Sequence, residues 1–579
     1  FDVTYKATDW FTIKGAYSMD KNFYEYTNFF PKGYATPTPS TVNNGAKQVD
    51  ASDRSTQIMS ATAIFTKTFG DFNVNGVLKY QSENYYFNWT RMYADNFAAE
   101  GVEDFIGGQD NRFLDSYISE EQAEDYFVNV KVDYADKYIF DGLVRRDGSS
   151  LFGENERWQT YYRASLAYRI TQDFEIPYVQ EMKVRASYGV SGQRPDFTGQ
   201  YETFSVDNTG ISPVTLGNKD LKPSEIGELE VGLDVNFFTS YTFVANYSYT
   251  VAKDQFLRVP LAGYMGYTSQ FQNAGEVTAT ALEFSIGGTP VTGDFTWNFN
   301  VGWDKITQEI SALDMPPFTR DHVNYPPYAA INLFRVEEGL PYGTMYGNLV
   351  LESVDDLTVD ENNYVLNGGY TEVTVADFTT NSDGYVILKG TENTIDEKPI
   401  LLTDDKGEVK VTKIGDTNPD FNLGLVNTFN YKGITLYTLI EWSQGGDIYN
   451  YTKQLLYFND RHLDADEYTE LGKKKTYFDG SSVLYNKSSP ISHFVEDGTY
   501  VKVREISLSY DFDTQMLGKV GEYVDNLKLS LIGRNLFTFT QYTGFDPEVA
   551  ISDNPTNFKL DEYSYPNYRT YAVTLQVSF

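Results

Sequence analysis

The residue types that most often carry catalysis or bind transition metals are scarce in this sequence. None of its 579 residues is a cysteine, and its three histidines are His322, His462 and His493. Their separations fit no metal-ligand motif, and a thiolate site is impossible. We also find no glycine-rich phosphate-binding loop and no nucleophile elbow. The sequence therefore predicts that the protein is not an enzyme and holds no metal or cofactor.

Aromatic side chains are abundant instead, with 47 Tyr, 40 Phe and 6 Trp. An aromatic ring can stack on the face of a sugar or pack against an apolar side chain. We select as candidate substrate contacts Trp89 and Tyr93, near the outer end of a predicted hairpin, and Trp442 and Tyr449, where a predicted strand becomes a loop. The competing interpretation is an aromatic girdle at a membrane interface, which the sequence favours over substrate contact.

These side chains must be positioned by strands, because period-two alternation of apolar and polar residues recurs along the chain. Leu229–Phe237 places Leu, Val and Phe at its odd positions, and the pattern returns at 241–250, 295–304 and 571–579. Strands of about ten residues can cross a bilayer when tilted. Successive side chains point to opposite faces. The polar positions predicted to line a polar interior are Glu230, Asp234, Asn298 and Asn300.

Charge and hydropathy narrow the classes of protein. The formal net charge of −35 argues against nucleic-acid binding, which needs clustered Lys and Arg. No run approaches 18 consecutive apolar residues and the mean hydropathy is −0.42, so a helical membrane protein is excluded. A transmembrane β-barrel remains possible because half of each strand faces a polar interior.

The connections between the predicted strands sort into two kinds. We count about seventeen strands, which are joined alternately by tight turns and by long polar segments, the longest near 310–418. Short turns at one rim and long loops at the other are typical of outer-membrane barrels, and a soluble sandwich has no reason to sort its loops in this way. The sequence therefore predicts an all-β, antiparallel transmembrane barrel with long extracellular loops.

The direction of the first strand and the type of the last residue lead to two further expectations. If the last strand ends at the periplasmic rim, counting back by alternation makes the first strand run inward from outside. A complete barrel starts at the periplasmic rim with an even number of strands, so we expect upstream strands to be absent here. The terminal Phe579, preceded by apolar residues at every second position, resembles the signal that the barrel-assembly machinery reads.

Several segments resemble, in order, the SusC/RagA branch of the TonB-dependent transporters. The matching segments are RRDGSSLFGENERW (Arg145–Trp158), KVRASYGVSGQRP (Lys183–Pro195), GNKDLKPSEIGELEVG (Gly217–Gly232), EGLPYGTMYG (Glu338–Gly347), GDTNPDF (Gly415–Phe421), DGTYVKVREISLSYDF (Asp497–Phe512), GRNLFTFTQYTGFDPEV (Gly533–Val549) and RTYAVTLQVSF (Arg569–Phe579).

The resemblance implies a barrel of 22 strands with an N-terminal plug and a short box that engages TonB. Nothing in residues 1–579 looks like the plug or the box. We therefore expect the chain to be the C-terminal part of the barrel, without the plug and the first strands. Relatives often carry a calcium-loop-like stretch before GDxNPDF; here the segment from Thr403 lacks the ligand spacing, and we expect no metal there.

The resemblance also implies a function. A bulky nutrient would be captured under a SusD-like lipoprotein lid and imported through the bacterial outer membrane, driven through TonB, with a dimer of such pairs as an option. An oligosaccharide is the first expectation for the substrate and an oligopeptide the second. A passive porin and a surface adhesin remain as alternatives.

Overall fold

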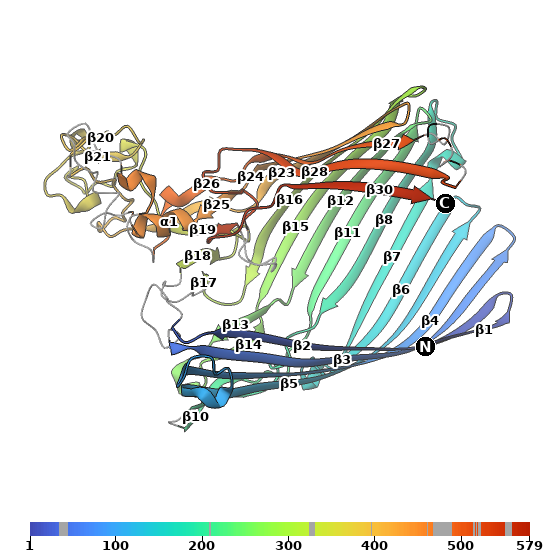
Figure 1. Cartoon of the computed structure of the whole chain (residues 1–579), viewed down its shortest axis with the longest axis horizontal. Helices are drawn as coiled ribbons and strands as arrows, with labels where there is room; N and C mark the ends of the chain where they lie inside the picture. The colour runs from blue at the N-terminus through green and yellow to red at the C-terminus, as the bar shows by residue number, and fades with distance from the viewer. Residues whose placement is uncertain are drawn as a thin grey trace. The chain divides into compact units, whose positions relative to one another are not determined.

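The computed structural model describes residues 1–579 except 34–43, 208–209, 323–330, 395, 460, 467–483, 485–488, 513–515, 517, 519–520, 522, 550–558 and 579. Phe579 thus lies outside the described residues. Among the described residues the largest sheet contains seventeen strands (Figure 1). These strands are β1 (Asp2–Thr8), β2 (Phe11–Phe30), β3 (Ala46–Phe69), β4 (Phe72–Phe97), β5 (Gly108–Tyr134), β6 (Tyr138–Ser149), β7 (Trp158–Arg169), β8 (Val179–Gln193), β11 (Ser224–Phe237), β12 (Tyr241–Lys253), β15 (Gly275–Val291), β16 (Phe295–Leu313), β23 (Pro419–Tyr431), β24 (Ile434–Gly445), β27 (Tyr500–Phe512), β28 (Asn526–Thr540) and β30 (Thr570–Ser578).

Smaller elements lie in the long connections between these strands. The short strands are β9 (Thr203–Asp207), β10 (Gly210–Leu216), β13 (Phe256–Pro260), β14 (Ser269–Asn273), β17 (Phe318–His322), β18 (Ile331–Val336), β19 (Thr344–Asn348), β20 (Phe378–Thr380), β21 (Val386–Leu388), β22 (Val411–Asp416), β25 (Asp447–Asn450), β26 (Val495–Asp497) and β29 (Leu560–Asp561). The α-helix is α1 (Tyr451–Phe458), and short 3-10 turns complete the connections. No helix in the described part of the chain is both long and apolar enough to cross a membrane.

Two compact units can be distinguished. The first comprises Phe1–Gln172, Val184–Glu230 and Thr250–Glu276, and the second comprises Asp173–Lys183, Val231–Tyr249 and Val277–Phe579. In the first unit, β1 to β7 pair as antiparallel neighbours in chain order. In the second unit, β16, β23, β24, β27, β28 and β30 do the same.

Tight turns and longer connections alternate along most of the chain, as the sequence predicts, but around β7 the connection at 150–157 and the turn at 170–178 have similar lengths. Three of the tight turns contain two consecutive residues with positive φ: Ala135 and Asp136 at 57° and 57°, Phe238 and Thr239 at 46° and 63°, and Lys432 and Gly433 at 43° and 83°. This combination belongs to type I′ turns, whose twist matches that of the flanking strands. Each of these turns therefore reverses the chain without interrupting the ladder.

The strands near the N-terminus are much longer than the ten residues predicted. β3, β4 and β5 contain 24, 26 and 27 residues. The segments predicted as loops at 30–54 and 94–122 contain strand residues, which is a correction: 46–54 belongs to β3, 94–97 to β4 and 108–122 to β5. The physical reason is that a strand loses its apolar period where neither face meets an apolar medium, although its backbone ladder continues.

The first unit has one continuous apolar face near its tight turns. Register places apolar side chains of β4 to β7 in rows across that face. The rows are Leu78, Val128, Val144 and Tyr162; Val74, Val132, Phe140 and Leu166; and Phe72, Tyr134, Tyr138 and Tyr168. Most of these side chains are exposed, Val144 by 54% and Leu166 by 55%. A surface so apolar and so exposed requires an apolar medium outside the protein.

The second unit repeats this arrangement. One row across β23, β24, β27, β28 and β30 consists of Phe429, Leu436, Leu508, Leu531 and Val573. Val573 is 71% exposed. Each unit thus presents an apolar face, and its opposite face carries the polar residues of the same strands.

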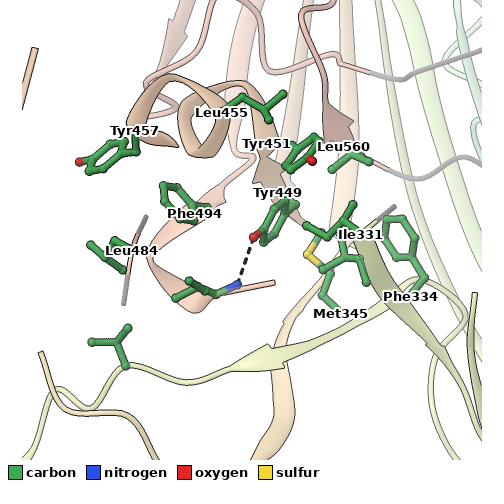
Figure 2. Packing of buried hydrophobic residues seen from close by; sticks show 13 residues of the cluster. Ile331, Phe334, Met345, Tyr449, Tyr451, Leu455, Tyr457, Leu484, Phe494 and Leu560 are labelled. Atoms are coloured by element: carbon green, nitrogen blue, oxygen red, sulfur yellow. Dashed lines mark hydrogen bonds between the residues drawn. The ribbon is translucent and has the colours of Figure 1, made fainter. Parts of the chain in front are cut away.

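The long connections of the second unit have hydrophobic cores of their own. The larger core gathers residues between positions 331 and 560, with Tyr449, Tyr451 and Phe494 fully buried at its centre (Figure 2). The smaller core lies within 351–402 and contains Leu351, Phe378, Val386 and Ile400 among others. These connections therefore form packed structure.

His493 lies beside the larger core in a chain of buried polar groups. Its Nδ1 contacts the Tyr385 hydroxyl, and its Nε2 lies 3.2 Å from the Tyr457 hydroxyl. Burial and the nearby charge of Lys453 lower the pKa of His493 to about 3, and His462 adds to this effect while Asp464 opposes it. The imidazole therefore stays neutral in the folded protein at ordinary pH.

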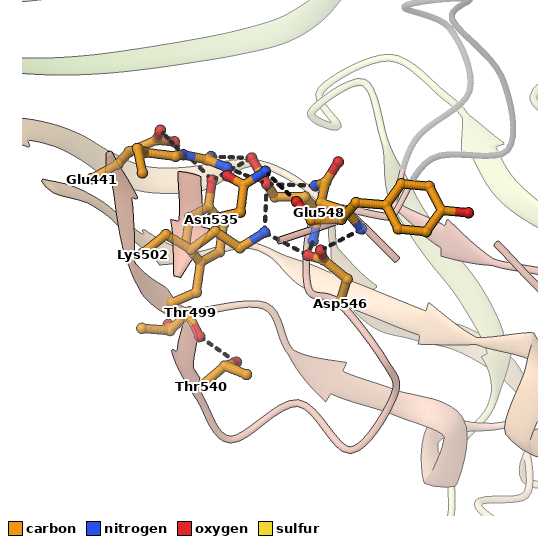
Figure 3. Close-up of polar contacts among 11 residues, drawn as sticks. Glu441, Thr499, Lys502, Asn535, Thr540, Asp546 and Glu548 are labelled. Atoms are coloured by element: carbon orange, nitrogen blue, oxygen red, sulfur yellow. Dashed lines mark hydrogen bonds and ion pairs between the residues drawn. The ribbon is translucent and has the colours of Figure 1, made fainter. Parts of the chain in front are cut away.

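An ion cluster fastens the segment after β28 to the polar face of the second unit (Figure 3). The ammonium group of Lys502, which is 1% exposed, lies 2.6 Å from Asp546 Oδ1 and also pairs with Glu548. Arg504 Nε lies 2.7 Å from Glu441 Oε2, and its Nη1 donates to Glu548 at 2.6 Å. Burial would raise the pKa of Glu548, but Arg504 and Lys502 outweigh it and hold this pKa at about 2.

We expect Glu548→Gln to destabilise this segment by about 2–4 kcal/mol, because the substitution leaves the buried Lys502 and Arg504 partly unpaired. Limited proteolysis of the connection after β28 measures the effect. Glu505→Gln, which removes the partner of the exposed Arg534, is the matched control and should cost at most about 1 kcal/mol. The wild type should also lose stability as pH falls from about 4.5 toward 2, because the unfolded carboxyl takes up a proton first. Equal proteolysis of the two variants would contradict this assignment.

We expect the α1 region to lose stability as pH falls below about 6.5. The unfolded imidazole takes up a proton there, whereas folded His493 does so only near pH 3, so protonation favours the unfolded segment. At pH 5 the loss should approach about 2 kcal/mol. Hydrogen exchange of Tyr451–Phe458 at pH 7.5 and pH 5, corrected for intrinsic rates, measures it. His493→Gln should abolish the pH dependence, and an unchanged dependence would refute the mechanism.

Candidate functional site

The polar face of the first unit carries charged side chains in register with one another. Arg145 on β6 lies 3.3 Å from Asp125 on β5 and 3.4 Å from Asp147 on its own strand. Arg163 on β7 pairs with Asp141 on β6. These charges occupy alternate positions to the apolar rows described above. The face thus offers a hydrated, charged wall and is unsuited to contact with lipid.

The four polar residues predicted to face the interior all have polar neighbours. Glu230 pairs with Arg185, and Asp234 lies 2.7 Å from Lys183. Asn298 accepts a hydrogen bond from Thr289 Oγ1 at 2.6 Å, and Asn300 donates one to Ser285 Oγ at 3.3 Å. A lumen-facing position for Glu230, Asp234, Asn298 and Asn300 remains our proposal.

Trp89 and Tyr93 lie well inside β4, on the face that carries Lys79 and opposite the face of Leu78. The last apolar row on β4 contains Tyr80, whose ring centroid lies 5.0 Å from that of Tyr126 on β5. Nine residues separate Tyr80 from Trp89, or about 30 Å along a strand. A membrane-interface girdle would lie at the edge of the apolar face, so the girdle interpretation does not fit Trp89 or Tyr93.

Trp442 and Tyr449 have different surroundings. Trp442 on β24 faces the apolar side, in register with Leu423 and Val501, and its ring packs edge-on against Phe421 at 5.0 Å. This position fits the girdle interpretation. Tyr449 is fully buried, donates to Gln454 Oε1 at 2.7 Å and accepts from Ile491 N at 3.1 Å. Tyr449 is corrected from a substrate contact to a core residue, because it presents no surface to a ligand.

The two histidines whose side chains are described, His462 and His493, pack within the long connections. His493 is part of the core network, His462 stacks on Tyr457, and the side chain of His322 lies outside the described residues. Within the described part of the chain, no group of three or more His, Asp or Glu residues could hold a metal ion. In the segment from Thr403, the Asp404 carboxylate accepts hydrogen bonds from the backbone N–H groups of Lys406 and Glu408.

Sequence reasoning missed the partners of Trp89 and Tyr93 on the neighbouring strands. Register brings Tyr24, Phe113 and Tyr117 to the same face as these two residues. The signal available was the spacing of aromatic residues at odd positions between 85 and 93. Without the register of β2 to β5, this signal could not be joined to residues 60 positions away.

Comparison with known proteins gives consistent results. The model of the "TonB dependent receptor-like, beta-barrel" family matches residues 1–390. TonB-dependent receptor P3 of Formosa agariphila is 29% identical over 548 residues, which cover 89% of this chain and 51% of the relative. TonB-dependent receptor SusC of Bacteroides thetaiotaomicron is 22% identical over 578 residues, covering 90% of this chain and 52% of SusC.

A solved structure shares the fold. The structure of the RagAB peptide transporter aligns with 100% of this chain and 61% of its own, with a TM-score of 0.76 and 18% identity. The chain spans about half the length of the curated relatives it matches. The family match covers more than half of the chain. The chain therefore belongs to the TonB-dependent receptor β-barrel family, whose members are outer-membrane receptors and transporters and not enzymes.

Proposed function

We propose that the protein imports an oligosaccharide across the bacterial outer membrane in a TonB-dependent manner. The observation that carries this proposal is the two-faced sheet. Its apolar rows suit contact with lipid, and its opposite face carries ion pairs such as Arg145 with Asp125 and Lys183 with Asp234. A hydrated wall of this kind suits the passage of a polar nutrient.

The proposal includes partners. Energy would come through TonB, engaged by an N-terminal plug segment, and a SusD-like lipoprotein would cover the long connections, with pairs of the two proteins able to dimerise. The packed cores of the connections support this part, since they build a folded surface on which a lid could rest. SusC is one of the relatives, and the fold is shared with the RagAB peptide transporter.

Three other functions compete with this proposal. RagAB is a peptide transporter, so an oligopeptide is the rival substrate. A passive porin would need neither plug nor energy, and a surface adhesin would use the connections without transport. The charged face favours a pathway for polar solutes over adhesion alone.

We expect deletion of the gene to abolish uptake of a fluorescent neutral oligosaccharide mixture by cells of the native host, and the wild-type gene to restore it. Collapse of the proton gradient should stop uptake in the complemented strain, because TonB action depends on that gradient. Uptake is measured per cell by flow cytometry.

Each alternative gives a different result in the same assay. Uptake that continues after the gradient collapses would indicate a porin. Undiminished uptake after deletion, with weaker attachment to surfaces, would indicate an adhesin. Loss of labelled oligopeptide uptake alone would replace the sugar by a peptide.

A further inference from the structure

On β4, the face opposite the apolar rows becomes aromatic with distance from the tight turns. Near the turns, Leu78 and Val74 of β4 lie on the apolar face and Lys79 on the opposite one. Beyond Tyr80 the first face carries mainly polar residues, Ser82, Asn84, Asn88 and Thr90, beside Tyr86 and Met92, while the face of Lys79 becomes aromatic. The register of β4 with β3 and β5 is unbroken from Phe72 to Tyr93, so the aromatic residues and Lys79 lie on one continuous face.

We propose that this aromatic face is a binding surface for a neutral oligosaccharide outside the bilayer. The proposal rests on the import function proposed above and assigns to it a capture site. We call the site the aromatic surface, and define it by Tyr24, Tyr26, Trp89, Tyr93, Phe113 and Tyr117, which share one face of β2, β4 and β5.

Four rings of the aromatic surface are exposed to a ligand, and those of Trp89 and Tyr93 are half-buried among them. Tyr24 is 57% exposed, Phe113 49% and Tyr117 41%. Trp89 lies directly opposite Tyr117 in the ladder, and Tyr93 stacks on Phe113 with ring centroids 5.1 Å apart. Residues on the same face of a strand recur about every 7 Å, and strands lie about 4.8 Å apart, so these rings form one broad patch. Flat rings at such spacing can stack on successive sugar rings.

Polar side chains lie between the rings at positions that suit hydroxyl groups. Arg91 donates to both carboxylate oxygens of Asp50, at 2.8 Å and 3.1 Å, and its guanidinium lies 4.9 Å from the centre of the Trp89 ring. The bidentate pair holds Arg91 against the ring. Asn28 and Gln48 share the row of Tyr93 and add amide donors and acceptors.

Charge and backbone pairing bear on the class of ligand. Four carboxylates share this part of the face with two guanidinium groups: Asp20, Asp50, Asp115 and Glu121, against Arg54 and Arg91. The excess of negative charge disfavours polyanionic sugars. A peptide that binds by strand addition needs an open sheet edge, and β4, which carries Trp89 and Tyr93, is paired on both sides. In the described residues, the ladder of β2 with β1 stops at Ala16 and that of β5 with β6 stops at Ala123, so a peptide could add only at the sides of the surface. A neutral oligosaccharide fits the charge and needs no open edge to stack on the rings at the centre of the surface, and a peptide added at its sides is the rival that the peptide probe tests.

Calorimetric titration of the purified full-length protein in detergent micelles tests the proposal. The probes are the neutral hexasaccharides maltohexaose, cellohexaose, xylohexaose and mannohexaose. We expect at least one to bind, and Trp89→Ala and Tyr117→Ala each to weaken that binding roughly tenfold through the loss of a stacking ring. Trp89→Phe should restore most of the affinity, which separates loss of the ring from a folding defect.

Tyr86→Ala is the matched control, because Tyr86 lies on the opposite face of β4, in register with Ser55 and Glu120. Its affinity should equal that of the wild type. Failure of all four sugars to bind, or equal affinities of Trp89→Ala and Tyr86→Ala, would overturn the proposal. Binding of a hexapeptide library that depends on Trp89 would overturn the sugar class. The assay needs no TonB, so a negative result here with energised uptake intact would refute the aromatic surface alone.

Discussion

Backbone pairing in an apolar medium is the constraint on which the rest of this structure depends. Within hydrocarbon no water can satisfy an unpaired N–H or C=O group, so a spanning strand must be bonded to neighbours along its length. In the first unit β3 to β6, and in the second unit β23, β24, β27 and β28, are paired on both sides of their apolar rows, with register shifts only at isolated bulges. Once the backbone is extended and paired, side chains alternate between two faces. An apolar face and a charged face then follow from the same strands.

The backbone ladder of β3 to β5 continues beyond the part of the sheet that contacts lipid. This extension gives the protein sheet surfaces outside the bilayer. β3 to β5 run far beyond their apolar rows, and there the residues are free to serve recognition. The aromatic surface uses this freedom on the first unit. In the second unit, the connections between strands form cores of their own. The ion pair of Lys502 with Glu548 ties the connection after β28 to the polar face. The same sheet thus serves as a wall at one height and as a scaffold for binding at another.

The features that the sequence could predict are those with a local signal. Alternation located the strand at Leu229–Phe237 inside β11, and turn residues located Ala135–Lys137 and Lys432–Gly433. The extension of β3 to β5 had little local signal beyond the aromatic residues at odd positions between 85 and 93, because apolar alternation fades outside the bilayer. Burial of Tyr449 could not be predicted either, since its core gathers residues from positions 331 to 560. Register, which joins Trp89 to Tyr117, is likewise a property of paired strands and of no single segment.

Spin labels at successive positions of β28 and β4, in protein reconstituted in bilayers, give the most direct test of this account. Accessibility to oxygen, which partitions into lipid, and to a water-soluble nickel chelate distinguishes the two media at each position. We predict that residues 527, 529, 531 and 533 favour oxygen while 528, 530 and 532 favour nickel, and that 85 to 91 favour nickel on both faces. Uniform accessibility along β28, or preference for oxygen at 85 to 91, would contradict the assignment of the two faces.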